Sequence, residues 1–335
     1  MKMQFWKFVG TLCFALAVTF CQSAYAIKAN PRAITVRQPD GTTLVVRIHG
    51  DENHHYLATL DGYRVAVDKK GFYRYVEFDA TCNKLRLTDL LVHDVAARGT
   101  DEQVRLSKMK KAQAIEAEWK SRNPLKPKMI EHTLSPMVIN PSAYAWTPAN
   151  SARKVTRAGE PNESQYLCIL VNFADNKMKF KKNNFEDFLN SKGYAGYGSV
   201  KDYFRENSGG QFVPNFQVVG PYTLPLPQSS YASNDYETGE DLNPRQMVLD
   251  ALALVREKNP ELNFKQFDND GDGVMDNCYI IYAGYSEAST GNEADMWPHS
   301  WTLLKEQRPI YDGITVNSYS CSQELVGSPE ENPTP

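Results

Sequence analysis

The sequence is poor in cysteine and has no paired cysteine motif. Six cysteines occur in 335 residues, and two of them lie within the first 26 residues. The other four are widely spaced, at Cys82, Cys168, Cys278 and Cys321, without any Cys-x-x-Cys pair. This pattern excludes a dense disulfide framework and a thiolate zinc site. Cys168 and Cys278 stand within apolar runs, where small buried side chains are expected.

A strong excess of charge is also absent. The formal net charge is −3, with 23% charged and 41% hydrophobic residues. This composition is that of an ordinary globular protein and not of a disordered chain. The overall charge favours neither nucleic acid nor an anionic membrane surface, so we expect no nucleic-acid partner.

Long apolar runs are missing after the N-terminus, so no stable membrane span is expected. Residues 1–26 read as a signal peptide, with Lys2 and Lys7 before an apolar stretch from Phe8 to Phe20. Ala24-Tyr25-Ala26 gives a small-x-small cleavage site. The apolar stretch is shorter than the roughly 20 residues that a spanning helix needs, which favours cleavage over anchoring. We therefore expect a secreted or periplasmic protein.

Motifs for nucleophilic or nucleotide chemistry are absent. The sequence has no Gly-x-Ser-x-Gly elbow, no Gly-x-Gly-x-x-Gly and no Gly-Lys-Ser/Thr loop. It also has no His-Glu-x-x-His, and its last histidine is His299, between Trp297 and Trp301. His299 is either a ligand near a cleft or, as we favour, a packing residue. Adjacent His54 and His55 would point to opposite faces of a strand and cannot form a metal pair.

The patterns predict an α+β protein built from two units. Residues 27–97 contain alternating hairpins around Pro39–Gly41 and Asp68–Gly71, followed by a helix and a Pro-rich linker over 98–165. Within that stretch, spacing predicts one helix over 100–121. Residues 166–327 alternate buried strands with helices, which indicates a mixed sheet, with Ile314–Tyr319 as an edge strand. Residues 328–335 form a polar tail.

The strongest chemical motif is an acidic loop at residues 268–276. Its carboxylates, Asp268, Asp270, Asp272 and Asp276, occupy positions 1, 3, 5 and 9 of a calcium loop, and Val274 would add its carbonyl at position 7. Oxygen ligands in this number suit calcium. Position 12 is a tyrosine, where an EF-hand has glutamate, and the loop runs into a strand. We therefore expect a structural calcium loop of the general Asp-x-Asp-x-Asp-Gly type and not an EF-hand. The alternative is an acidic surface turn capped by its own side chains.

Ordered segments along the chain resemble the immune inhibitor A type of secreted metalloproteases, the sixth metallopeptidase family. Three segments resemble its propeptide: His49–Glu52, Thr59–Val65 and Gly71–Tyr75. Two resemble the start of its protease domain: Ser199–Ser208 and Gly210–Phe212. The acidic loop and three further segments match later landmarks: Asn243–Met247, Tyr282–Gly284 and Trp297–His299. The resemblance covers nearly all of residues 30–327.

This resemblance implies a propeptide followed by part of a zincin-like domain. It also implies zinc-dependent hydrolysis of protein or peptide substrates. In the family, the zinc is bound by a helix bearing His-Glu-x-x-His. That helix follows the segment that ends here at Glu324–Gly327. Because the motif is missing, no zinc ligand and no catalytic residue is assigned, and a truncated or inactive chain is expected. The alternative is a calcium-stabilised binding or inhibitory protein derived from a protease.

Without that helix, apolar surface should be left uncovered in the second unit. We expect Leu170, Ile280 and Tyr282 to be exposed. Each Å² of apolar surface left in water would cost about 25 cal/mol of stability. Marginal folding of the second unit follows from this expectation.

Overall fold

The computed structural model describes residues 28–123, 163–235, 237–327 and 329. The predicted signal peptide, most of the predicted Pro-rich linker and nearly all of the predicted polar tail lie outside the described residues. Helices and strands both occur, as expected for an α+β protein.

The first half forms an antiparallel six-stranded meander, called here the N-terminal sheet. Its strands follow chain order: β1 (Ala33–Arg37), β2 (Thr43–Asp51), β3 (His54–Thr59), β4 (Arg64–Val67), β5 (Tyr73–Asp79) and β6 (Lys84–Leu91). Gly41 and Gly71 close the two predicted hairpins with φ of +87° and +84°, which L side chains rarely adopt. Strands β3 and β6 were not predicted from the sequence.

The helix predicted over residues 100–121 is wrong as a single element. Two helices occupy this stretch, α2 (Thr100–Leu106) and α3 (Ala112–Arg122). The break allows Leu106 to pack with one cluster of the N-terminal sheet, while Ile115 and Trp119 pack with another. One straight helix would place these side chains on a common line and could not serve both clusters.

The second half contains a five-stranded mixed sheet, called here the C-terminal sheet. Its strands are β7 (Glu163–Asn172), β8 (Val213–Thr223), β9 (Cys278–Tyr282), β10 (His299–Thr302) and β13 (Ser318–Gln323). The order is β10-β13-β9-β7-β8, with only β10 antiparallel to its neighbour within this sheet. The predicted mixed sheet is confirmed, although β7 begins three residues before the predicted boundary at residue 166.

The predicted edge strand at Ile314–Tyr319 is also wrong. Its first residues form β12 (Ile314–Thr315), which pairs with β11 (Ile310–Tyr311), and its last residues begin β13. Strand β13 lies between β9 and β10 inside the sheet. The chain leaves the first pairing at Asn317, whose carbonyl accepts a hydrogen bond from Leu303 N–H at 2.9 Å.

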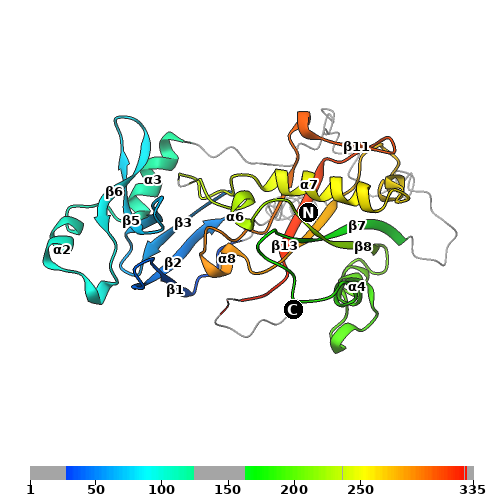
Figure 1. The fold of residues 1–335 in the computed structure, drawn as a ribbon, viewed down its shortest axis with the longest axis horizontal. Helices are drawn as coiled ribbons and strands as arrows, with labels where there is room; N and C mark the ends of the chain where they lie inside the picture. Colours follow the sequence, from blue (N-terminus) through cyan, green and yellow to red (C-terminus); the bar gives the residue numbers. More distant parts are fainter. Residues whose placement is uncertain (1–27, 124–162, 236, 328, 330–335) are drawn as a thin grey trace, which may run out of the picture.

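Helices cover both faces of the C-terminal sheet (Figure 1). The long α7 (Pro244–Lys258) packs on one face, and α4 (Lys182–Asn190) packs on the other with α5 (Val200–Asn207) beside it. The shorter elements are η1 (Val95–Ala97), η3 (Tyr194–Gly196), α6 (Gln228–Tyr231), η4 (Phe264–Phe267), α8 (Glu287–Thr290) and η5 (Lys305–Gln307).

This coverage corrects the expectation of exposed apolar surface. Leu170, Ile280 and Tyr282 are each 0% exposed. Leu170 packs with Phe185 and Leu189 of α4, whereas Ile280 and Tyr282 belong to the cluster on the α7 face. The described helices therefore bury these three side chains without a further helix.

The two sheets meet where α8 and the segment after it pack against the N-terminal sheet (Figure 1). Ala288 and Trp297 are buried in the same cluster as residues of β1, β2 and β3. The Trp297 ring stacks on His55 with 4.0 Å between ring centroids. Gly291, with φ of +65°, lies so close to Ile34 that an added Cβ would overlap its Cδ1 atom. The backbone therefore touches the sheet here.

Two acidic side chains lie at this junction, Glu287 buried and Glu293 half-buried. Glu287 is 2% exposed, and its Oε1 lies 2.6 Å from Nδ2 of Asn234, which also lies 3.2 Å from Nε2 of His55. Burial raises the pKa of Glu287 well above its usual range and lowers the pKa of His55 to about 4. Burial and the nearby Glu287 raise the pKa of Glu293 to about 7, although Val67 N–H donates to its carboxylate.

The raised pKa of Glu293 predicts that the contribution of this side chain to stability falls as pH rises. Between its usual value of about 4.5 and the folded value of about 7, the folded chain keeps a proton that the unfolded chain releases. This contribution is therefore complete below pH 4.5 and is lost as pH rises to about 7. Glu293→Gln stays neutral at every pH. Its free energy of unfolding, measured with urea, should therefore decline between pH 5 and pH 8 by roughly 2 kcal/mol less than that of the wild type.

The matched control is Glu261→Gln, at an exposed glutamate away from the junction. Its unfolding free energy should follow the wild-type curve across the same pH range. Parallel curves for the wild type and Glu293→Gln would contradict the burial of a proton-holding carboxyl at the junction.

Candidate metal site

The acidic loop lies between η4 and β9, at the entry to a central strand of the C-terminal sheet. Gly271 and Gly273 adopt φ of +79° and +86°, which gives the tight turns that the loop needs. Val274 forms a bridge with Thr315 of β12, and the bridge uses Gly273 C=O and Met275 N–H. The carbonyl of Val274 takes no part in those two hydrogen bonds.

Three of the four predicted carboxylates converge. Oxygens of Asp268, Asp270 and Asp272 lie within 4.8 Å of one another. Asp268 also accepts hydrogen bonds from the N–H groups of Gly271, Asp272 and Gly273, at 2.8, 3.0 and 3.0 Å. These contacts fix the loop around the carboxylate at position 1.

Asp276 is held differently from the other three. One of its oxygens, Oδ2, accepts from the N–H and the side-chain amide of Asn269, both at 2.8 Å. It still belongs to the same electrostatic cluster, because burial and then repulsion from Asp272, Asp276 and Asp268 raise the pKa of Asp270. The donor set consists of carboxylate oxygens, which fit a hard cation such as calcium better than zinc.

Asn269 is a residue of the loop whose role the sequence did not reveal. Its side chain accepts from Gln165 N–H at 2.8 Å and donates to Gln165 C=O at 3.0 Å. The loop is thereby tied to the first residues of β7. At position 2 of the motif, asparagine reads as a spacer, so no sequence signal would have identified this link.

The described histidines do not form a zinc site. His49, His54 and His55 lie on β2 and β3, His299 lies on β10, and His93 lies in the loop after β6. The opposite orientation of the adjacent pair is confirmed, since His54 contacts Glu116 and Trp119 while His55 contacts Trp297. These side chains offer no two histidines on one helix face, so they do not fit the metal that the family implies.

His299 is a buried packing residue. It is 1% exposed, its ring lies 4.1 Å from that of Trp301, and its Nε2 lies 2.9 Å from Tyr319 Oη. Its Nδ1 lies 2.7 Å from Trp297 C=O. The structure therefore supports the favoured reading and places His299 in the core.

The side chain of Glu324, to which the sequence analysis gave no role, connects the parallel strands β7, β9 and β13. It follows β13, and its Oε1 accepts from Lys179 and Phe180 N–H, each at 2.7 Å, while Oε2 accepts from Gly284 N–H at 3.3 Å. Burial raises the pKa of Glu324 above its usual value, although these hydrogen bonds offset part of the shift. Glu324 thus fixes loops at the carboxyl ends of β7 and β9, the edge where α/β sheets bind ligands.

No helix among the described residues is long and apolar enough to cross a membrane.

Known proteins are similar to this chain in sequence. A profile of the immune inhibitor A peptidase M6 catalytic domain matches residues 152–324, a little more than half of the chain. Immune inhibitor A from Bacillus thuringiensis subsp. alesti is 30% identical over 198 residues, covering 47% of this chain and 28% of that protein. Pre-pro-metalloprotease PrtV from Vibrio cholerae serotype O1 is 25% identical over 182 residues, covering 43% of this chain and 20% of that protein.

The aligned regions thus span less than a third of each relative's own length. The profile match falls on the C-terminal sheet and ends at Glu324, directly after β13. Zinc is the metal expected for a metallopeptidase of this kind. The chain belongs to the immune inhibitor A family of M6 peptidases, with the matched residues in its catalytic domain.

Proposed function

We propose that this chain supplies the propeptide and the N-terminal part of the catalytic domain of an exported zinc metallopeptidase precursor. The proposed parts are a signal peptide (1–26), a propeptide (27–97), a helix and linker (98–165), a partial zincin-like domain (166–327) and a polar tail (328–335). The observation that carries the proposal is the profile match over the C-terminal sheet with its antiparallel strand β10.

The proposed substrates are proteins or peptides in an extended conformation. Strand β10 ends the described C-terminal sheet, and a strand in that position can add an extended chain through main-chain hydrogen bonds. Arg245 of α7 donates to Thr302 C=O at 2.8 Å, which holds the end of β10 against α7. This chain would thus contribute a fixed edge for substrate.

The catalytic metal would need ligands other than those described. Zinc would supply an activated water in a peptidase of this family. The described histidines do not fit such a site, and the full sequence contains no His-Glu-x-x-His. We therefore propose that this chain contributes the scaffold and the substrate-binding edge of the peptidase and not its zinc ligands.

The 335-residue chain should not hydrolyse fluorescein-labelled casein in buffer containing zinc and calcium. Joining its residue 327 to the part of the Bacillus relative that follows the aligned region should restore hydrolysis, and 1,10-phenanthroline should abolish it. The matched control is the same fusion with the first histidine of its zinc motif changed to alanine. Hydrolysis by the 335-residue chain itself would overturn the assignment, and a folded but inactive fusion would count against the proposed catalytic domain.

We propose that the acidic loop binds calcium in a structural role. The ligands are Asp268, Asp270, Asp272 and Asp276 and the carbonyl of Val274. Burial and, after it, repulsion from the neighbouring aspartates raise the pKa of Asp270, and a divalent cation would offset that repulsion. It would also brace the loop that Asn269 ties to β7.

Calcium should raise the thermal midpoint of the chain, and Asp270→Asn should weaken calcium binding at least about tenfold by calorimetry. The variant keeps the shape of the side chain and removes one charge. Asp101→Ala, at an exposed aspartate in the first turn of α2, is the control and should bind as the wild type does. Equal calcium affinity for Asp270→Asn and the wild type would exclude this loop as the site.

Export through a cleaved signal peptide is the proposed route to the extracellular or periplasmic space. Cleavage after Ala26 should leave Ile27 as the first residue of the mature chain. Expression with the complete leader in a Gram-negative host, followed by N-terminal sequencing, should give Ile27, and Ala26→Pro should block the cut. An intact N-terminus on protein recovered from the cytoplasm would contradict this route.

A further inference from the structure

Strand β1 is the first strand of the N-terminal sheet, and among the described residues it pairs with β2 alone. The direction of its free backbone groups follows from its partner β2. Val45 lies opposite Thr35, yet its N–H donates to Asp94 at 3.2 Å and not to β1. Thr35 and Val45 are therefore a non-hydrogen-bonded pair, and backbone direction alternates along a strand. The N–H and C=O groups of Ala33, Thr35 and Arg37 point away from β2.

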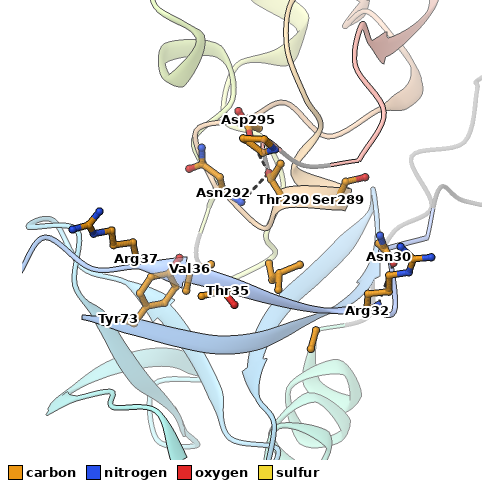
Figure 2. Close-up of a pocket in the computed structure, with 13 residues that line it drawn as sticks. Asn30, Arg32, Thr35, Val36, Arg37, Tyr73, Ser289, Thr290, Asn292 and Asp295 are labelled. Carbon is orange, nitrogen blue, oxygen red and sulfur yellow. Dashed lines mark hydrogen bonds between the residues drawn. The ribbon is translucent and has the colours of Figure 1, made fainter. Parts of the chain in front are cut away.

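A cavity of about 400 Å³ lies beside this edge. Figure 2 shows β1 on one side and Ser289, Thr290, Asn292 and Asp295 on the facing segment. Thr290 Oγ1 donates to Asp295 at 2.7 Å, which holds the facing segment in a closed turn. The volume falls within the range of ligand sites in proteins.

The walls of the cavity combine apolar and hydrogen-bonding groups. Ile34 and Val36 lie on the side of β1 that faces the core, together with Tyr73 of β5. Across from them stand the hydroxyl of Ser289 and the side-chain amide of Asn292. A strand added to β1 would send alternate side chains into this space, where small hydroxyl-bearing side chains fit both kinds of wall.

The opposite face of β1 and β2 carries positive charge. Arg37 and Arg47 are exposed there, and neither forms an ion pair with any described residue. Side chains directly across neighbouring strands interact, and opposite charges favour pairing. Acidic side chains on an added strand would lie beside Arg37.

We propose that the free edge of β1 and the segment Ser289–Asp295 form a binding groove for an extended acidic peptide, which adds to the N-terminal sheet as a seventh strand. Recognition combines main-chain hydrogen bonds to Thr35 and its alternate neighbours, small polar side chains in the cavity and carboxylates beside Arg37. The groove lies between the N-terminal sheet and the segment Ser289–Asp295, and binding there does not depend on proteolytic activity.

The test uses a fluorescein-labelled, C-amidated peptide of repeating Glu-Thr, six residues long, and the full chain. Fluorescence anisotropy should show saturable binding that weakens as salt rises. A peptide of repeating Lys-Thr should bind at least about tenfold more weakly. Arg37→Glu should reverse this preference.

Thr35→Pro removes the outward N–H of the central residue while sparing the β1–β2 ladder, because proline is tolerated where a strand N–H faces away from the sheet. It should weaken binding by about 5- to 10-fold, and Thr35→Ala, which keeps the N–H, should bind as the wild type does. In the wild type, hydrogen exchange at Thr35 N–H should slow when the peptide is added. This readout decides the matter if Thr35→Pro fails to fold.

Three outcomes would overturn the proposal. The first is no saturable binding of the Glu-Thr peptide. The second is binding that Thr35→Pro, in its folded form, leaves unchanged with no slowing of exchange at Thr35. The third is self-association that Thr35→Pro abolishes in the absence of peptide binding, because the occupant would then be a second copy of this chain.

Discussion

Close approach of the backbone at two glycines lets the two halves of the described chain pack against each other. Gly291 touches the side chain of Ile34, and a Cβ at Gly239 would overlap the carbonyl of His55. Both glycines have positive φ, so a larger residue would be strained as well as blocked. Because the backbones come this close, Trp297 reaches the ring of His55, and Glu287 is closed off from water.

The electrostatic character of the junction follows from that contact. A carboxyl group enclosed by packed side chains is cheaper to bury with its proton than without it. The protein places two such groups, Glu287 and Glu293, where one sheet meets the other. Packing of the two halves is thereby coupled to proton binding, and the contribution of these two carboxyls to the stability of the junction falls as pH rises.

Features coded within a few neighbouring residues could be predicted from the sequence. The hairpin turns at Gly41 and Gly71, the mixed sheet and the clustering of Asp268, Asp270 and Asp272 rest on local turn chemistry or periodicity. Long-range pairing could not be predicted in this way. The stretch Ile314–Tyr319 was predicted as an edge strand, but its last residues begin β13, which pairs with β9 and β10 from earlier in the chain and therefore lies inside the sheet.

The same division separates the parts of the candidate metal site. Spacing alone predicted that Asp268, Asp270 and Asp272 meet, although it also placed Asp276 among them. The attachment of Asn269 to Gln165, in contrast, spans more than 100 residues and leaves no local pattern. Glu324 is comparable, since one glutamate after a strand gives no sign that it will accept hydrogen bonds from two loops far away in sequence. The expectation that Leu170 and Ile280 would be exposed failed for a related reason: spacing predicted the helices but not which face of the sheet each would cover.

The core face of the N-terminal sheet is packed against the second half of the chain, whereas the β1 edge of the sheet borders a cavity. The core face near β1 is occupied by Trp297 and Ala288, while the outward backbone groups of β1 face a cavity. Both features involve one continuous stretch of chain, because Ser289, Asn292 and Asp295 line the cavity and Trp297 follows two residues after Asp295. A strand added at β1 would therefore contact the segment that carries the junction. Binding at that edge and packing of the two sheets involve the same few residues. Binding of a strand at β1 should therefore change the stability of the junction, and the state of the junction should change the affinity for the strand by the same free energy.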